Sequence, residues 1–459
     1  MERRDFLKTG LTAAAATGPF VVRALGASDE VRIGQIGLGT RGAYELEICQ
    51  RTKGAKVMAV ADVYQPLVDK YVSAANNAFT GYQDFRRILD RKDIDAVFVS
   101  TPDHWHAPIV IMACQAGKDV FCEKPLSHTL HEGQQMVKAA RKYNRVVQTG
   151  SQQRSATHFQ KIVDLIQKGH IGKISAIECW NEENDAPEGA GNPPDSDPPH
   201  GLDWDMYLGP APKVPYNRSR YIWHYRWFWD YSGGMMTDWG AHHMDIIQWA
   251  MQVDGPLSAT AAGGRFCLKD NCQTPDTLMT LFEYPGFVVR YSVRMGNSRR
   301  LEGRPNGVAF YGADGTLIVD RGSWEIVPEN APRFPNDYDR VEAWLKGGNV
   351  AWPVGFDHTA KVAPQPRCQA MGETGLHIDP ACQEAHIENF LACVRSRQRP
   401  VADVETGYRS ISACHAGVIA YRLGRKVKWD VQAQTFPGDA EAQALMTKKY
   451  RAPYTLPAV

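Results

Sequence analysis

Residues 31–42 read VRIGQIGLGTRG, an apolar strand pattern that runs directly into a glycine-rich turn and then into a helical stretch. The turn holds Gly37, Gly39 and Gly42 at the spacing G-x-G-x-x-G. In this setting the first glycine permits a tight turn, the second lets a pyrophosphate approach the backbone, and the third lets helix pack on strand. The helix start at Thr40 and Arg41 offers free N–H groups to phosphates. The pattern predicts a dinucleotide-binding turn.

An acidic residue follows at the distance that such a turn requires. Asp62 lies twenty residues after Gly42 and ends a second strand pattern at residues 56–62. A carboxylate in that place binds the adenosine ribose hydroxyls and repels a 2′-phosphate. We therefore expect NAD as cofactor in preference to NADP.

Further strand patterns at residues 96–101 and 119–124 enclose a helical pattern at residues 106–116. Strands alternating with helices predict an α/β fold with a doubly wound parallel sheet. Ligands bind beyond the carboxyl ends of such strands, and Lys124 ends one of them. A surface lysine in a loop is the alternative. The polar and aromatic residues at these strand ends are Thr101, Pro102, Trp105, His106, Glu123 and Lys124.

The predicted secondary structure and the composition of the chain change after residue 151. A helix is expected near residues 157–169 and a strand near 174–180, followed by a proline-rich loop at 185–200. The segment 221–231 is densely aromatic, and six of the twelve tryptophans lie between residues 204 and 249. Flat apolar faces with a polar edge suit sugar rings, although such rings also fill cores and oligomer interfaces.

Asp238 and His242 stand four residues apart at the start of an apolar helical pattern, so they can share one face. A carboxylate beside an imidazole can orient the ring and favour its charged form, which suits a general base. His242, His243 and Asp245 also contain metal-ligating groups. Because adjacent residues on a helix point in different directions, we expect no metal site here.

Several of these motifs together resemble those of the Gfo/Idh/MocA oxidoreductases. The resemblance is close over residues 30–255 and looser to about 430. It implies a Rossmann domain followed by an α/β domain with a large, mostly antiparallel open sheet. Members mostly oxidise or reduce one carbinol of a sugar, cyclitol or glycoside with tightly held NAD(P). The matching motifs are, in order, Gly37-Leu38-Gly39-Thr40-Arg41-Gly42, Thr101-Pro102 with His106, Glu123-Lys124-Pro125, and Gly233-Gly234 followed by Asp238-x-Gly240-x-His242-x-x-Asp245.

The resemblance also implies roles for individual residues. Lys124 matches the active-site lysine, which stabilises a developing alkoxide; His242 takes the hydroxyl proton, and Asp238 orients His242. How proton transfer is divided between Lys124 and His242 stays open. The implied cofactor-binding residues are Gly37, Gly39, Thr40, Arg41, Gly42, Asp62, Thr101, Pro102, His106, Glu123 and Lys124. The candidates for substrate contacts are Trp105, His106, Tyr225, Arg226 and His242.

Two other functions stay open. The family includes NAD-dependent glycosidases that oxidise a sugar, release its aglycone and reduce the product. Those with N-acetylgalactosaminidase activity usually lack a lysine at the place of Lys124, so Lys124 favours net oxidoreduction. A non-catalytic sugar-binding or cofactor-binding protein is the third interpretation, against which Lys124, Asp238 and His242 argue together.

Residues 1–27 have the parts of an export signal. Arg3-Arg4 precedes Phe6-Leu7-Lys8, and a weakly apolar stretch leads to a small-residue end, which predicts a twin-arginine signal peptide and a periplasmic protein. A frayed basic helix is the alternative. Since twin-arginine export moves folded proteins, we expect NAD to be bound before export and to stay bound.

The composition of the chain indicates which classes of binding partner are not expected. The chain has 459 residues and a net charge of +1, and this charge argues against nucleic-acid binding. Beyond the first thirty residues the sequence has no run of 18 apolar residues, so we expect no membrane span there. Cys267 and Cys272 form the one close cysteine pair in a loop-like stretch, a candidate disulfide. The family resemblance implies a homo-oligomer, a dimer or tetramer.

These patterns give a domain plan. After the signal peptide at 1–27, residues 28–150 form the NAD-binding domain and residues 151–430 the substrate and oligomerisation domain, with loop insertions near 183–220 and 330–380. Residues 431–459 form a C-terminal extension.

Overall fold

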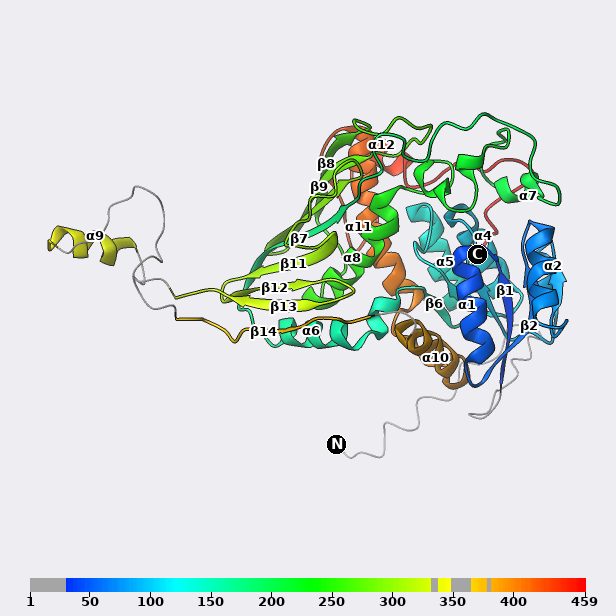
Figure 1. The fold of residues 1–459 in the computed structure, drawn as a ribbon, viewed down its shortest axis with the longest axis horizontal. Coiled ribbons are helices and arrows are strands. Elements are labelled where there is room, and N and C mark those ends of the chain that lie inside the picture. The colour runs from blue at the N-terminus through cyan, green and yellow to red at the C-terminus, as the bar shows by residue number, and fades with distance from the viewer. Residues whose placement is uncertain (1–29, 332–336, 348–364, 378–380) are drawn as a thin grey trace.

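The computed structural model describes residues 30–331, 337–347, 365–377 and 381–459. The predicted signal peptide at 1–27 lies outside these residues, as does part of the predicted insertion at 330–380. The described chain is built around two sheets that lie side by side, with helices between and around them (Figure 1).

The first sheet has six parallel strands in the order β3-β2-β1-β4-β5-β6. Its strands are β1 (Val31–Ile36), β2 (Ala55–Ala61), β3 (Thr80–Tyr82), β4 (Ala96–Val99), β5 (Asp119–Cys122) and β6 (Val147–Thr149). The helices that alternate with them are α1 (Thr40–Arg51), α2 (Gln65–Ala74), α3 (Arg86–Leu89), α4 (His106–Gln115) and α5 (Leu130–Lys142). Every residue of β4, β5 and β6 is buried, as expected for parallel strands covered on both faces.

The second sheet has nine strands in the order β14-β13-β12-β11-β7-β10-β9-β8-β15. Only β7 and β10 pair in parallel; the other neighbours are antiparallel. The fold class expected from the sequence is therefore confirmed. The strands are β7 (Ile174–Glu182), β8 (Ser258–Gly264), β9 (Thr277–Tyr284), β10 (Phe287–Arg294), β11 (Asn306–Gly312), β12 (Gly315–Val319), β13 (Trp324–Pro328), β14 (Met371–Glu373) and β15 (Val427–Lys428).

One face of the nine-stranded sheet is covered and the other is open. On the covered face α8 and α11 pack beside each other, so closely that a Cβ at Gly240 of α8 would lie 3.3 Å from the Cys414 sulfur of α11 and 3.2 Å from the Tyr291 ring of β10. The opposite face exposes Met279, Leu281 and Val288. The α-helices that follow β6 in the chain are α6 (Thr157–Gln167), α7 (Trp204–Leu208), α8 (Met235–Met251), α9 (Asp337–Leu345), α10 (Ala381–Ser396), α11 (Val404–Leu423) and α12 (Ala440–Ala444).

Parts of the C-terminal third of the chain pack against the first sheet and its helices. Helix α10, which the sequence plan placed in the second domain, packs on the first sheet, where the Phe390 ring meets Phe98 and Phe121 edge-on at 5.6 and 5.8 Å. Residues after α12 return to α5, where Lys448 forms an ion pair with Glu132 at 2.9 Å. The two halves are therefore joined by buried contacts from distant parts of the chain.

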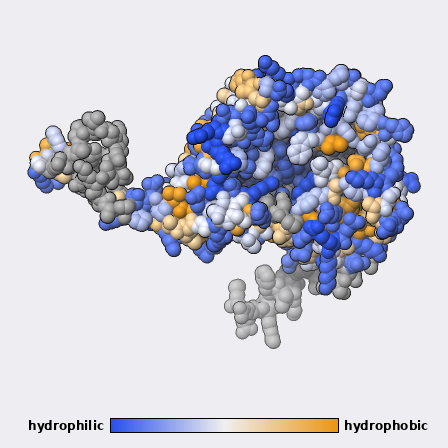
Figure 2. Space-filling model, in the orientation of Figure 1, coloured by the Kyte–Doolittle hydropathy of each residue, from blue (hydrophilic) through white to orange (hydrophobic). Residues whose placement is uncertain are grey.

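All ten cysteines lie in the described ranges and are free thiols, so the disulfide considered between Cys267 and Cys272 is not formed. Cys272 is buried and Cys267 is exposed. Among the described residues no helix combines the length and apolarity that a membrane crossing needs. The face shown in Figure 2 is largely hydrophilic, with small separate groups of apolar residues.

The position of α10 leads to a stability prediction. Phe390 is fully buried, so Phe390→Ala should lower the free energy of unfolding by about 3–5 kcal/mol, through lost transfer energy and a cavity. The matched control, Phe266→Ala, changes a ring that is 71% exposed and should cost about 0.5 kcal/mol or less. Denaturant unfolding measures both. Equal losses would contradict the packing of α10 on the first sheet.

Candidate active site

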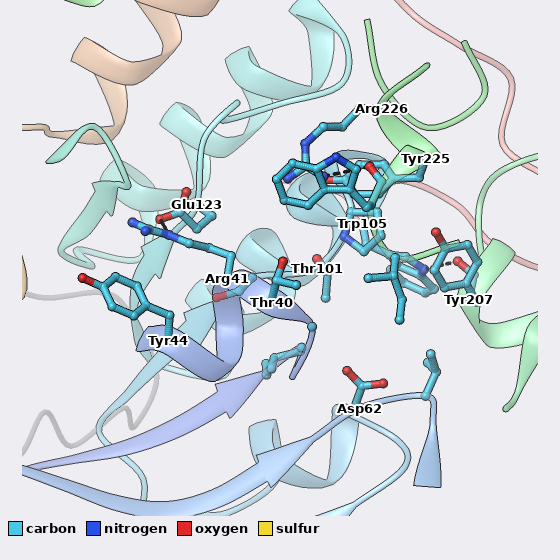
Figure 3. Close-up of a pocket in the computed structure, with 18 of the residues that line it drawn as sticks. Thr40, Arg41, Tyr44, Asp62, Thr101, Trp105, Glu123, Tyr207, Tyr225 and Arg226 are labelled. Carbon is cyan, nitrogen blue, oxygen red and sulfur yellow. Dashed lines mark hydrogen bonds and ion pairs between the residues drawn. The ribbon is translucent and has the colours of Figure 1, made fainter. Parts of the chain in front are cut away.

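A cavity of about 470 Å³, here called the main cavity, opens at the carboxyl ends of the first sheet and faces α8. Its walls come from the glycine turn, the ends of β2, β4 and β5, the aromatic segment 221–226, α8 and the β12–β13 turn. Figure 3 shows residues of these walls, with Asp62 at one end of the view, Arg226 at the other and Thr101 between them. Of the residues singled out from sequence, those that line it are Gly37, Gly39, Thr40, Arg41, Asp62, Thr101, Pro102, Trp105, Glu123, Lys124, Tyr225, Arg226, Asp238 and His242.

The three glycines of the turn have separate functions. Gly37 has a φ of +90° and a Cβ there would lie 2.7 Å from the Ser100 carbonyl oxygen, so only glycine fits. At Gly42, which lies outside the cavity wall, a Cβ would come within 2.0 Å of the Gly37 carbonyl oxygen, which explains the close contact of helix and strand. At Gly39 nothing lies within 4 Å of a Cβ position. Gly39 thus leaves space for a ligand beside the start of α1, where no side chain caps the helix.

Two polar groups beside this turn fit a dinucleotide. The Asp62 carboxylate accepts a hydrogen bond from the Leu38 N–H at 2.7 Å and keeps its place at the cavity wall; burial raises the pKa of this carboxyl. The Thr101 hydroxyl is buried in the same wall and has no hydrogen-bond partner among the residues that the structure describes. Buried polar groups rarely stay unpaired, so this hydroxyl and the open space at Gly39 both fit a bound cofactor.

Arg41 and Glu123 connect the glycine turn to Lys124. The Arg41 guanidinium donates to the Glu123 carboxylate at 2.8 Å, and that carboxylate accepts from the Lys124 backbone N–H at 3.0 Å (Figure 3). The Glu45 carboxyl group is buried beside Arg41 and Glu123. Burial and the Glu123 charge raise the pKa of Glu45 well above its ordinary value. We conclude that Arg41 and Glu123 position the end of β5.

Lys124 and Asp238 form the central contact of the cavity. The Lys124 ammonium lies 2.5 Å from the Asp238 Oδ1 atom, and the Arg226 Nε atom lies 3.3 Å from the same oxygen. Burial alone would raise the pKa of Asp238, but the Lys124 and Arg226 charges outweigh burial and lower that pKa to about 2. Asp238 is therefore an anion at any physiological pH, and it fixes the Lys124 ammonium at the cavity wall.

His242 has a different partner from the one expected. The sequence predicted that Asp238 orients His242, but the Asp238 carboxylate is bound to Lys124 and Arg226, and the His242 Nε2 atom lies 3.1 Å from an Arg321 nitrogen. A guanidinium only donates, so Nε2 accepts and is unprotonated. Burial, followed by the Lys124 and Arg321 charges, lowers the pKa of His242 well below its ordinary value. The His242 ring is therefore neutral, with an unprotonated Nε2 atom, and it lines the main cavity.

His106, predicted to contact cofactor and substrate, does not line the main cavity. It is buried and absent from the cavity walls, and its ring nitrogens each lie 2.8 Å from a backbone carbonyl oxygen, those of Thr101 and Pro125. This ring ties the loop after β4 to the loop after β5. A sequence motif does not distinguish a ligand contact from such a backbone contact, so ligand binding by His106 stays a prediction.

The other predicted substrate contacts line the cavity with their rings, while their polar atoms are bonded within the protein. The Trp105 indole N–H donates to the carbonyl oxygens of Met206 and Tyr207, both at 3.0 Å. The Tyr225 hydroxyl donates to Asp103 at 3.1 Å. Both side chains therefore offer apolar surface to a ligand rather than a hydrogen-bond donor.

The side chains considered for a metal have other partners. His243 lies 3.0 Å from the Asn181 amide oxygen, and Asp245 forms an ion pair with Arg154 at 2.8 Å. In the part of the chain that the structure describes, no group of three or more His, Cys, Asp or Glu could hold a metal ion.

Among the cavity residues that sequence reasoning did not single out are Gln152, Trp239 and Arg321. Trp239 stands within the motif around Asp238 and was considered only as one of many aromatics. Arg321 lies in the β12–β13 turn, about eighty positions from His242, and its guanidinium stacks on the Trp239 ring at 4.5 Å. No local sequence signal marks such a residue, because only the sheet brings it to the cavity.

The fold and the cavity are those of dinucleotide-binding oxidoreductases. The chain belongs to the Gfo/Idh/MocA oxidoreductase family: the domain described as "Oxidoreductase family, NAD-binding Rossmann fold" matches residues 31–151, and the "Oxidoreductase family, C-terminal alpha/beta domain" matches residues 172–262 and 373–456. Together the two matches cover more than half of the chain: all six strands of the first sheet and, of the second sheet, β7, β15 and most of β8.

Curated relatives match about a third of the chain. An inositol 2-dehydrogenase/D-chiro-inositol 3-dehydrogenase of Shouchella clausii is 31% identical over 160 residues, 34% of this chain and 46% of that protein. An alpha-N-acetylgalactosaminidase of Shewanella oneidensis is 30% identical over 152 residues, 31% of this chain and 33% of that protein. The matched stretch thus spans between a third and half of the relatives' own length.

Solved structures match over most of the chain. The WlbA dehydrogenase of Chromobacterium violaceum was solved with NADH and UDP-GlcNAcA. It has a TM-score of 0.62 at 17% identity, with 89% of this chain and 99% of that one covered. A putative myo-inositol dehydrogenase of Sinorhizobium meliloti has a TM-score of 0.56 at 18% identity, with 87% and 99% covered. At this identity the likeness shows the fold.

The unpaired hydroxyl in the cavity wall can be tested. Thr101→Val removes one hydrogen bond to a bound cofactor, so NAD affinity should fall roughly threefold to tenfold, while thermal stability stays the same or rises. Thr149→Val is the matched control, because the Thr149 hydroxyl is also buried and unpaired but does not line the main cavity. Calorimetric titration measures both. Equal NAD affinity in the two variants would contradict a cofactor contact at Thr101.

Proposed function

We propose that this chain is an NAD-dependent oxidoreductase that transfers a hydride between one carbinol of a sugar or glycoside and nicotinamide held in the main cavity. One observation carries the proposal. A fixed ammonium at Lys124 and a neutral imidazole at His242 line the same cavity as the open glycine turn. A secondary alcohol placed between them meets both groups that its oxidation needs.

The chain's own residues would handle the hydroxyl. The Lys124 ammonium, held by Asp238, donates to the hydroxyl oxygen and stabilises the negative charge that develops on it. His242 takes the hydroxyl proton at Nε2 once the substrate displaces the Arg321 nitrogen from that atom. Bound nicotinamide supplies the hydride acceptor. The sugar ring would lie against the aromatic wall formed by Tyr225 and Trp239.

The proposed cofactor, substrate class and oligomeric state each rest on particular residues. Asp62 supports NAD over NADP, because a carboxylate at that wall repels a 2′-phosphate. The aromatic wall supports a sugar or glycoside. The exposed apolar side chains of Met279, Leu281 and Val288 support a homo-oligomer, a dimer or tetramer, formed through the open face of the second sheet.

We also propose that the mature protein is periplasmic and is exported with its NAD already bound. This rests on the twin-arginine pattern in residues 1–27, which lie outside the described residues. Tight retention of the cofactor would be needed there, since free NAD is scarce outside the cytoplasm.

A redox-neutral glycosidase is a second candidate, because an alpha-N-acetylgalactosaminidase is among the curated relatives. Its reaction would oxidise a ring carbinol, release the aglycone and reduce the sugar again. The two candidates differ in one readout: a net dehydrogenase accumulates the reduced-nicotinamide absorbance band, whereas the glycosidase releases aglycone with no net change in that band.

The proposed role of Lys124 can be tested on protein purified without added cofactor. Lys124→Ala should lower turnover of an oxidised sugar roughly a hundredfold or more, because the charge that stabilises the alkoxide is lost. The NAD content after dialysis should not change. Lys213→Ala, at an exposed lysine far from the cavity walls, is the control and should keep full turnover. Full turnover in Lys124→Ala would contradict the proposal.

The contact between Arg321 and His242 predicts a change in pH dependence. The Arg321 charge lowers the pKa of His242, so Arg321→Gln should raise it. Because His242 must be neutral to accept the proton, the acid limb of kcat/KM should move to higher pH in the variant. Arg367→Gln, at an arginine outside the cavity, is the control. An unchanged acid limb would contradict proton transfer to His242.

A further inference from the structure

A second cavity, of about 200 Å³, lies directly behind one wall of the main cavity. Four residues line both cavities: Trp223, Arg226, Asp238 and Trp239. The partition is thus one layer of side chains thick, and it includes the carboxylate that holds Lys124. Trp223 stands at its edge with 53% of its surface exposed, and the Arg226 guanidinium stacks on its ring at 4.7 Å. A molecule bound at Lys124 would have to pass this edge to reach the second cavity.

The charges of the second cavity are mostly satisfied within the protein. Asp270 pairs with Arg265 and accepts hydrogen bonds from the backbone N–H groups of Ala190 and Cys272, at 3.0 and 2.9 Å. Arg226 pairs with Asp238.

Two carboxylates of the second cavity lack such partners among the described residues. Glu183 and Asp185 also line the second cavity, and among the described residues their side chains have neither a hydrogen bond nor an ion pair. The groups left for a ligand are therefore acceptors with negative charge, beside the ring of His224 and the faces of Trp223 and Trp239.

We propose that the second cavity binds the second ring of a glycoside substrate, and that this ring is an uncharged polyhydroxyl unit. This deepens the proposed function and rests on it. Carboxylates accept hydrogen bonds from hydroxyl groups, and tryptophan faces stack on the C–H faces of sugar rings. A nucleoside diphosphate in the same place is disfavoured, since its phosphates would face Glu183 and Asp185 without a free cation to pair with them. The preferred substrate is thus a neutral glycoside, neither a free monosaccharide nor a sugar nucleotide.

The test compares matched ligands on the NAD-loaded full chain. The probes are glucose and galactose, their disaccharides maltose, cellobiose and lactose, and UDP-glucose. Binding is followed by tryptophan fluorescence, because two tryptophans line the partition, and oxidation by the reduced-nicotinamide band. We expect at least one disaccharide to bind roughly tenfold or more tightly than its monosaccharide, and UDP-glucose to bind no better than glucose.

Variants then locate the extra affinity. Glu183→Gln and Asp185→Asn should each weaken disaccharide binding roughly threefold to tenfold, with kcat and KM for the monosaccharide unchanged. Glu188→Gln removes one charge from the same loop at a position outside both cavities and should change nothing. The substitutions conserve shape, so folding is not expected to limit the comparison.

The outcomes separate the two proposals. If monosaccharides reduce the bound NAD but disaccharides bind no better, or if Glu183→Gln and Glu188→Gln behave alike, the second-ring site is wrong and the oxidoreductase stands. Tighter binding of UDP-glucose would also overturn it. If disaccharides bind as expected but no probe reduces NAD, the proposed oxidation fails. If no probe binds, both proposals fail.

Discussion

The ion pair between Lys124 and Asp238 is the contact on which the arrangement of the site depends. Lys124 follows β5 of the first sheet, and Asp238 lies in the first turn of α8, which packs on the second. Burying a carboxylate is costly unless it is paired, and here two cations pair with it. The same contact therefore joins the two halves of the molecule and fixes an ammonium in the wall of the main cavity.

This pair is supported from both sides. Toward the first sheet, Glu123 holds the Lys124 backbone and is itself held by Arg41, which follows directly on the open glycine turn. Toward the second, Arg226 links Asp238 to the aromatic segment and so to the partition between the two cavities.

Sequence reasoning predicted the parts of the structure that follow from local pattern. The glycine spacing, the acidic residue at Asp62, the alternation of strands and helices, and a lysine at a strand end each have a physical meaning that one segment reveals. The partners of His106, His242 and Asp238 could not be found in this way, since a side chain's contacts depend on which distant segment folds against it. Arg321 and helix α10 show the same limit: only the completed sheets bring them to their places.

A double-mutant cycle on Lys124→Ala and Asp238→Ala, read as kcat/KM for an oxidised sugar together with NAD affinity, tests the central claim most directly. If the two side chains act as one unit, each single variant should lose nearly as much kcat/KM as the double variant, with NAD affinity maintained in all three. Losses that add up independently, or a loss of NAD affinity that accounts for the lost activity, would contradict the claim that this ion pair is the reacting centre.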